Sequence, residues 1–238
     1  MESKILSITC PKILSGSALK LIACLSMLSD HLSKCYLNRF SWVNAIWFTI
    51  AGKSISLLQL MLWFGRFAFP IFVFLLVEGF EKTRNRKRYG LSLFVLALLS
   101  EIPFNLMIGN DLFHPLHNVI FTLLIGYLAL CCLDYFKSMP LLGLLSIVGF
   151  YLISRYMNAD YKSTGYIFIL LIYGLRKERI IQCTVAPTLM MMKLMVFLSL
   201  LLTCMYNGKR GFIKTPFLKY CFYAFYPVHM LIIYLLAK

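Results

Sequence analysis

Ionisable side chains lie inside the apolar stretches of this chain, and they are of types that accept protons and stabilise charge. The first group surrounds His31: Ser26, Asp30 and Lys34 recur every four residues, which places them on one face of a helix. Adjacent helical residues do not face each other, so a carboxylate from another helix would orient His31 better than Asp30 does. Because a neutral imidazole titrates near physiological pH, His31 is a candidate general base, with Asp30 at the same site.

Arg66 and Glu101 supply a second cation and a second carboxylate, and a proline follows each of them closely. Pro70 cannot donate a backbone hydrogen bond to the carbonyl of residue 66, so a helix should kink there. Broken helices at membrane depth are tolerated where they line a cavity. We expect Arg66 and Glu101 to take part in catalysis; the alternative is a structural ion pair between the two.

Further polar side chains lie near the ends of apolar segments or inside them. They are His117, Asn118, Asp160, Tyr161, Tyr226 and His229. For His229, a buried histidine with satisfied hydrogen bonds is as good an interpretation as a functional one. The eight cysteines show no metal-type spacing, so we interpret them as small hydrophobic side chains and expect no metal.

These residues must be positioned by membrane-spanning helices. Hydrophobic residues make up 61% of the 238 residues, and the mean hydropathy is +0.80. Apolar runs of about twenty residues, the length of one span, recur along the chain. The sequence predicts one all-α membrane domain over residues 1–238, a helix bundle with about eight spans: 17–36, 57–80, 89–108, 117–136, 139–156, 163–176, 184–205 and 217–236.

Two segments depart from this regular pattern. Segment 42–56 contains Trp42, Trp47 and Lys53, and we interpret it as interfacial or as the start of the second helix. The span predicted over 163–176 is short, which is typical of a tilted or half-inserted helix. The first span carries Asp30 and His31, which argues against a cleaved signal peptide.

The charge distribution gives an orientation. Lys and Arg number 24 against nine Asp and Glu, a net charge of +15, and no basic patch with interleaved aromatic residues supports nucleic-acid binding. Basic loops mark the cytoplasmic side of a membrane protein. The N-terminal segment and the basic loops 82–88 and 176–179 would share the cytoplasm, whereas 109–116 would lie outside. The basic residues of 209–214 contradict this scheme, because they too would lie outside.

The same topology gathers the buried polar residues. A charge near the bilayer centre costs about 2.5–3.5 kcal/mol on insertion scales, so such residues usually face a bundle interior. His31, His117 and Asp160 map to the outer third of the bundle, and Arg66 and Glu101 lie slightly deeper. We therefore expect one water-accessible reaction site.

Taken together, these segments resemble the TraX family, named for the F-pilin acetyltransferase of conjugative plasmids. The resemblance covers almost the whole chain, in the family's order: LKLIA at 19–23, SDH at 29–31, GRFAFP at 65–70, EGF at 78–80, TRN at 83–85 with Tyr89, SEIPF at 100–104, NVIFT at 118–122, DY at 160–161 with Gly165, and YPVH at 226–229. One departure is Lys162, where relatives tend to have glycine.

The resemblance implies acyl transfer in the bacterial cytoplasmic (inner) membrane. Acetyl-CoA would be the co-substrate, and a pilin-like N-terminal amine or a cell-surface glycan the acceptor. His31 would be the base, Arg66 would stabilise the oxyanion, and Glu101 or Asp160 would orient His31. The substrate or acyl path would be lined by His117, Asn118, Asp160, Tyr161, Tyr226 and His229. The CoA phosphates would be bound by Arg84, Arg86 and Arg88.

Two other classes of protein are alternatives to an acyltransferase. A proton-coupled transporter would use them as a relay, and inverted repeats would favour it, but the sequence shows none. A non-catalytic assembly protein for pili or fimbriae would need few buried charges.

Overall fold

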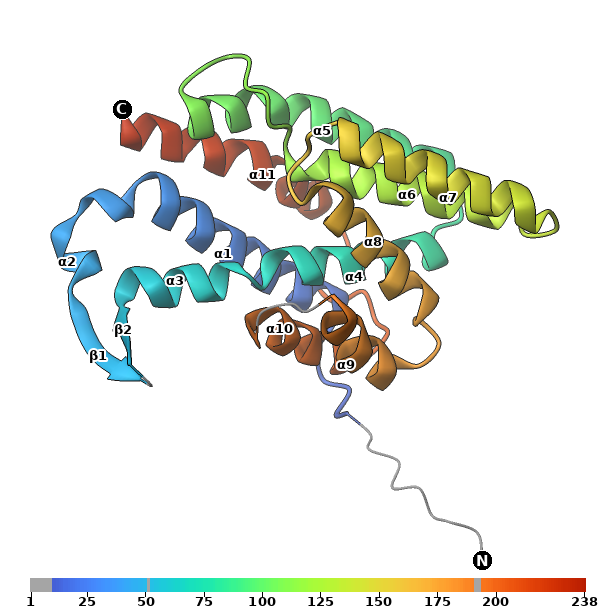
Figure 1. Cartoon of the computed structure of the whole chain (residues 1–238), viewed down its shortest axis with the longest axis horizontal. Helices are drawn as coiled ribbons and strands as arrows, with labels where there is room; N and C mark the ends of the chain where they lie inside the picture. The colour runs from blue at the N-terminus through green and yellow to red at the C-terminus, as the bar shows by residue number, and fades with distance from the viewer. Residues whose placement is uncertain (1–9, 51, 191–193) are drawn as a thin grey trace, which may run out of the picture.

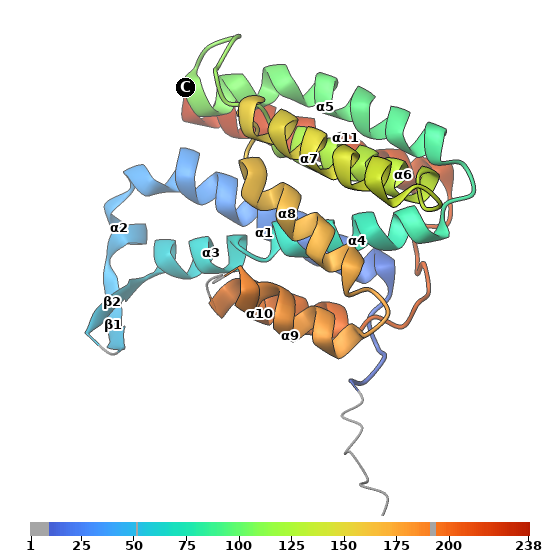
Figure 2. The same cartoon turned by 45° about the vertical axis from the view of Figure 1, so that its right-hand side comes forward.

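The computed structural model describes residues 10–50, 52–190 and 194–238, and most of them are helical. Long helices run roughly along one direction and are stacked side by side (Figures 1 and 2). The helices are α1 (Gly16–Cys35), η1 (Leu37–Arg39), α2 (Ser41–Asn44), α3 (Leu57–Gly65), α4 (Ala68–Lys82), α5 (Arg86–Gly109), α6 (Val119–Tyr135), α7 (Pro140–Tyr156), α8 (Lys162–Gly174), α9 (Arg179–Leu189), α10 (Leu194–Cys204) and α11 (Pro216–Ala237). The predicted all-α fold class is confirmed in this coarse form.

The second predicted span is broken where Pro70 indicated. Helix α3 ends at Gly65 and α4 begins at Ala68, because Pro70 has no N–H for the carbonyl of residue 66. The polar face of α1 covers the break: Ser26 Oγ donates to the carbonyls of Phe64 (2.7 Å) and Gly65 (3.1 Å). A Cβ at Gly65 would lie 2.6 Å from the Cβ of Asp30, so only glycine allows α1 to approach this closely.

The segment between α2 and α3 forms a β-hairpin, β1 (Ile46–Ile50) with β2 (Lys53–Ser56), in antiparallel pairing. The interpretation of 42–56 as the start of the second helix is therefore wrong. The side chains of Ile46, Trp47, Phe48 and Ile50 are exposed, which is typical of a segment at a membrane interface. The interfacial placement stays a prediction.

The prediction of one continuous helix over 184–205 is also wrong. Two helices, α9 and α10, lie against each other there, with residues 191–193 between them outside the described part of the chain. Each has 11 residues, a length of about 17 Å at 1.5 Å per residue. Both are shorter than a hydrocarbon core of about 30 Å, and because they pack against each other the chain turns back between them. The predicted shortness of the helix near 163–176 is confirmed, since α8 has 13 residues.

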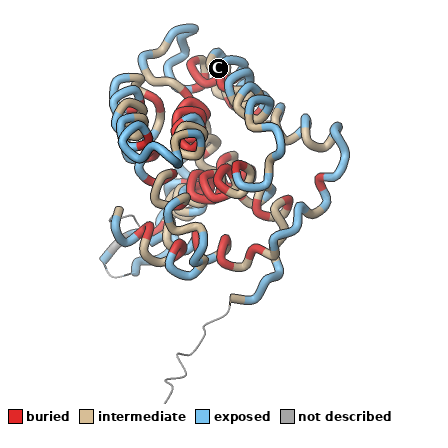
Figure 3. Tube along the Cα trace, turned by 90° about the vertical axis from the view of Figure 1, so that its right-hand side faces the viewer, coloured by how far each residue is buried: buried red, intermediate tan, exposed pale blue. Residues whose placement is uncertain are grey.

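Buried residues lie where the helices face one another, and exposed residues line the outside of the helix stack (Figure 3). Phe74, Phe80, Tyr127 and Phe168 are buried in the interior. In contrast, α5 and α7 expose large hydrophobic side chains that include Leu98, Leu99, Leu141, Leu144 and Leu145. Within the described residues, three helical segments are long and apolar enough to cross a membrane: Leu57–Lys82, Arg86–Gly109 and Pro216–Ala237. An apolar exterior around a packed interior is typical of a protein with lipid as its solvent.

The basic segments meet at one end of the helix stack. The backbone of α1 begins beside the loop after α10, because Gly16 N donates to the Lys209 carbonyl. Lys82 at the end of α4 donates to the Gly208 carbonyl of the same loop at 3.0 Å. Arg179, at the start of α9, binds Glu78 of α4 at 2.8 Å. We call this the basic end; Ala237, the last residue of α11, lies at the other end, beside Arg39.

This arrangement removes the contradiction between the basic residues of 209–214 and the predicted orientation of the chain. Since α9 and α10 return to the basic end, residues 209–214 share a side with 82–88 and 176–179. We expect single cysteines at Lys87 and Lys209 to react with a membrane-impermeant maleimide from one side, and a cysteine at Asp111 from the other. Labelling of intact cells and of inverted vesicles, in a background without the native cysteines, measures this. Opposite labelling of Lys87→Cys and Lys209→Cys would restore a full span over 184–205.

Candidate functional site

A cavity of about 210 Å³ lies where α1 crosses the break between α3 and α4. His31 and Arg66 both line it, so two residues that are 35 positions apart in sequence share one void. The other walls come from α1, the end of α3, α4, α6 and the α7–α8 loop, namely Met27, Asp30, Lys34, Gly65, Ala68, Phe69, Phe72, Val119, Leu123, Asp160 and Tyr161. We call it the His31 cavity.

The partner of His31 is His229 of α11. The Nδ1 atom of His31 lies 2.8 Å from Nε2 of His229, and the two ring planes are nearly parallel, with an interplanar angle of 2°. The other nitrogen of His229, Nδ1, lies 2.7 Å from the Phe225 carbonyl, which can only accept. His229 Nδ1 therefore carries a proton, and its Nε2 accepts the proton of His31 Nδ1. This series of hydrogen bonds leaves His31 Nε2 unprotonated and able to act as a base.

Sequence reasoning assigned the orienting role to a carboxylate, Glu101 or Asp160, and the structure gives that position to His229. The signal was present in the sequence as a second histidine inside an apolar span. It was interpreted as a path residue or a satisfied core residue, because nothing in the spacing along the chain relates α1 to α11. His229 is in fact both buried and hydrogen-bonded.

Arg66 lies at the break between α3 and α4, exposed at the edge of the His31 cavity. Within the described residues its guanidinium makes no ion pair, so the alternative of an Arg66–Glu101 pair is wrong. Asp30 binds Lys34 one turn away at 2.5 Å, which matches the expectation that Asp30 does not orient His31.

Asp160 and Tyr161 enter the His31 cavity from the α7–α8 loop. The Tyr161 ring stacks on Phe69 with centroids 3.8 Å apart, and Asp160 Oδ1 accepts from the Tyr161 N–H at 3.0 Å. Burial raises the pKa of Asp160 above its ordinary value, although that hydrogen bond and Lys34 act in the opposite direction. The loop therefore places a partly desolvated carboxylate on the cavity wall.

The departure at Lys162 coincides with an unusual backbone. Tyr161 and Lys162 have φ angles of +63° and +41°, in the left-handed region that glycine adopts without strain. A glycine would suit this position, and this chain holds lysine there against the local preference. Gly165 keeps the loop close to α6, since a Cβ there would lie 2.8 Å from Thr122 Cγ2.

Glu101, His117 and Asn118 form a separate cluster outside the walls of the His31 cavity. Glu101 contacts His117 Nδ1 at 2.5 Å and the Asn118 side-chain amide at 2.6 Å. Asn118 also donates to the Ala97 carbonyl and accepts from the Ile120 N–H at the start of α6. Every polar group of the buried Asn118 side chain is thus used to join α5 to α6. The structure therefore does not bring these three side chains to the walls of the His31 cavity, although the His117 carbonyl accepts the N–H of Asp160 at 2.9 Å.

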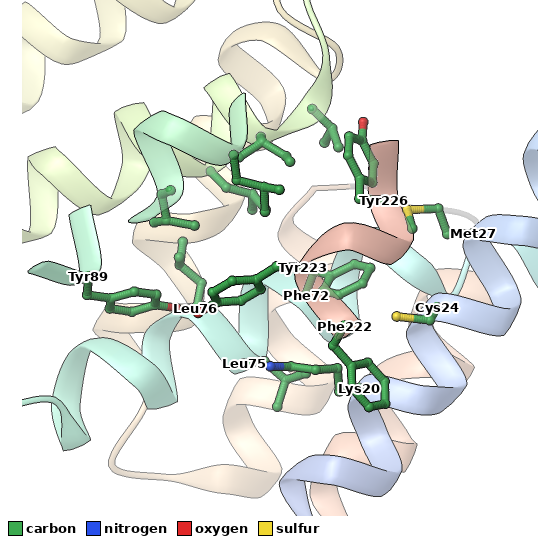
Figure 4. A pocket seen from close by; sticks show the side chains of 15 residues that line it. Lys20, Cys24, Met27, Phe72, Leu75, Leu76, Tyr89, Phe222, Tyr223 and Tyr226 are labelled. Atoms are coloured by element: carbon green, nitrogen blue, oxygen red, sulfur yellow. The ribbon is translucent and has the colours of Figure 1, made fainter. Parts of the chain in front are cut away.

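Tyr226 lines a second, mostly apolar cavity of about 140 Å³ (Figure 4). Its walls come from α1, α4, α5, α6 and α11. This apolar cavity shares Met27, Phe72, Val119 and Leu123 with the His31 cavity, so the two voids are neighbours. Tyr226 therefore lies next to the site but not in it.

The three arginines expected to bind phosphates lie apart. Arg86 binds Asp134 of α6 and covers the Phe80 ring, and Arg84 is exposed in the loop before α5. Arg88 alone lines a basic cavity, together with Arg210, Lys214 and Lys219. Sequence reasoning missed these last three, because the supposed span over 184–205 moved them to the opposite side of the membrane.

The fold and the site define a helical membrane protein with a histidine pair and a free arginine beside an internal cavity. The sequence model of the TraX protein family matches residues 15–237, and the chain belongs to this family. A curated relative, the probable fimbrial assembly protein FimC of serogroup H1 from Dichelobacter nodosus, is 26% identical over 242 residues, covering 91% of this chain and 93% of the relative. No solved structure matches the chain.

Proposed function

We propose that this protein is a membrane-embedded acyltransferase that moves an acetyl group from acetyl-CoA to an acceptor amine or hydroxyl. The observation that carries the proposal is the His31–His229 pair, which leaves an unprotonated nitrogen on His31 in a cavity that also contains a free arginine. The family and the fimbrial relative support a pilin-like N-terminal amine as acceptor, with a cell-surface glycan as the alternative.

The reaction that we propose is a direct transfer. His31 Nε2 takes a proton from the acceptor as its nitrogen or oxygen attacks the thioester carbonyl carbon. Arg66 stabilises the oxyanion that forms. The Nδ1–H of the His31 imidazolium donates a hydrogen bond to His229 Nε2. When the carbon–sulfur bond breaks, the CoA thiolate takes the proton from His31. The acceptor is then acylated and free CoA thiol is released.

The membrane arrangement proposed for this reaction is seven crossings and one re-entrant pair, α9–α10. The basic end faces the cytoplasm by the positive-inside rule, in the bacterial cytoplasmic membrane. The N-terminus then lies in the cytoplasm, and the C-terminus lies outside. The His31 cavity is nearer the outer end, because His31 is in the last third of α1.

The test is transfer by purified protein in lipid nanodiscs with radiolabelled acetyl-CoA. We expect thiol release that depends on an acceptor peptide bearing a pilin N-terminus, with the label on the peptide. The same peptide with a blocked α-amine is the matched control, and a glycan acceptor tests the alternative. Binding of acetyl-CoA without any transfer, or no binding, would contradict an enzymatic role. The name of the relative, a fimbrial assembly protein, makes a non-catalytic assembly role the second candidate in that case.

A further inference from the structure

Four cations surround a cavity of about 360 Å³ at the basic end. They are Arg88, Arg210, Lys214 and Lys219, and no acidic side chain lines this cavity. Within the described residues none of the four makes an ion pair. A cation cluster of this kind, on a protein where other basic residues such as Arg86 and Arg179 are paired, is suited to a multiply charged anion.

Aromatic rings line the same basic cavity. Tyr89, Tyr220 and Tyr223 lie on its walls, and Lys219 is 5.4 Å from the centroid of the Tyr223 ring. Tyrosine rings offer faces on which a nucleobase can stack. The combination of cations and ring faces favours a phosphorylated nucleotide over an isolated phosphate.

A series of neighbouring cavities joins the basic cavity to His31. A void of about 490 Å³ shares Arg210, Lys219 and Tyr223 with the basic cavity and adds Lys20. Lys20, Tyr89 and Tyr223 in turn belong to the apolar cavity of Figure 4, where α1 presents Lys20, Cys24 and Met27 along one wall. That cavity shares Met27 and Phe72 with the His31 cavity.

The length of this series limits the ligand. Lys20 and His31 are eleven residues apart on α1, a distance of about 16 Å at 1.5 Å per residue. A ligand that has its phosphates at the basic cavity and its reacting carbonyl at His31 must join them by an extended, narrow arm. An acyl-CoA has this form, because its pantetheine arm separates the 3′-phosphate and diphosphate from the thioester.

We infer that the basic cavity formed by Arg88, Arg210, Lys214 and Lys219 binds the 3′-phospho-ADP part of acyl-CoA, with the pantetheine arm along α1 toward His31. This inference rests on the proposed acyl transfer and specifies where its donor binds. An anionic lipid headgroup offers the same phosphate chemistry at a membrane surface, so the test must separate the two sources.

The test compares Lys214→Gln/Lys219→Gln with the matched control Lys87→Gln/Lys137→Gln, whose two charges are exposed and outside the cavity. All variants are assayed in nanodiscs of phosphatidylcholine alone, after gel filtration shows them to be monodisperse. We expect the first variant to raise Kd for adenosine 3′,5′-bisphosphate and KM for acetyl-CoA at least about tenfold, since charge-assisted phosphate contacts are lost. We expect kcat, and the KM for an acetyl-pantetheine thioester, to be unchanged, and the control to behave as the wild type.

Each outcome bears on one claim. Equal affinity of wild type and Lys214→Gln/Lys219→Gln for the bisphosphate would overturn the assigned site and leave acyl transfer standing. If the bisphosphate binds with the expected variant effect but no acetyl group is transferred, the site stands and the proposed function fails. In nanodiscs with added phosphatidylglycerol, a variant effect confined to lipid retention, with unchanged bisphosphate affinity, would make the cavity a lipid-headgroup site and overturn the inference.

Discussion

His31→Ala should lower the rate of acyl transfer by at least about 100-fold, the lower limit for a lost general base, while the protein remains folded in the membrane. The reason is that His31 Nε2 is the unprotonated nitrogen at the end of the chain from the Phe225 carbonyl through His229. The measurement is kcat/KM for acetyl-CoA in nanodiscs, together with the thermal unfolding midpoint.

Two further variants decide whether His31 acts as a base or only packs. His114→Ala is the matched control, because this imidazole lies in the α5–α6 loop and not on the wall of the His31 cavity. His229→Gln should retain more activity than His229→Ala, since the glutamine carbonyl can accept the proton of His31 Nδ1 as Nε2 of His229 does. Unchanged transfer in His31→Ala would remove His31 from catalysis, and equal losses in the two His229 variants would contradict the positioning role of His229.

Asn118→Ala should lower the free energy of unfolding by about 3 kcal/mol or more. The change removes an N-cap hydrogen bond at the start of α6 and the two side-chain amide hydrogen bonds to the Ala97 carbonyl and the Glu101 carboxylate, which keeps only its contacts with His117 and the backbone. Asn118 is fully buried, so water does not replace these hydrogen bonds. Thermal and denaturant unfolding in detergent measure the effect.

The matched control for this prediction is Asn38→Ala. Asn38 also donates its amide to a backbone carbonyl, that of Lys34, but it does so on the exposed surface, where a loss of about 0.5 kcal/mol is the usual limit. A stable Asn118→Ala variant that has lost transfer would contradict the structural role and return Asn118, with Glu101, to the catalytic site.

The helices could be predicted from the sequence because long apolar runs with few charges have one stable form in lipid. The break near Arg66 could be predicted because Pro70 acts locally through a missing N–H. The polar face of α1 was also predictable from its spacing. Pairings between helices were not. His31 and His229 are 198 residues apart, and no periodicity within one helix indicates the rotation or depth of another.

The α9–α10 pair shows how one wrong segment affects a site elsewhere. Hydropathy does not distinguish one helix of about twenty residues from two half-length helices that return to the same side. Pro187, near the end of α9, was a local signal. The basic residues over 209–214 were a stronger one, because they contradicted the predicted orientation. Taking that contradiction as evidence against the span would have placed Arg210, Lys214 and Lys219 at the basic end.

The β1–β2 hairpin has a consequence for work with the isolated protein. A ladder of two strands leaves both outer edges with unpaired backbone groups, and here the side chains along β1 are large and apolar. At the predicted membrane interface, lipid headgroups would cover this region. In solution the same residues offer a template on which a second molecule can add a strand. Monodisperse material therefore requires a detergent or lipid belt wide enough to shield residues 46–50 as well as the helices.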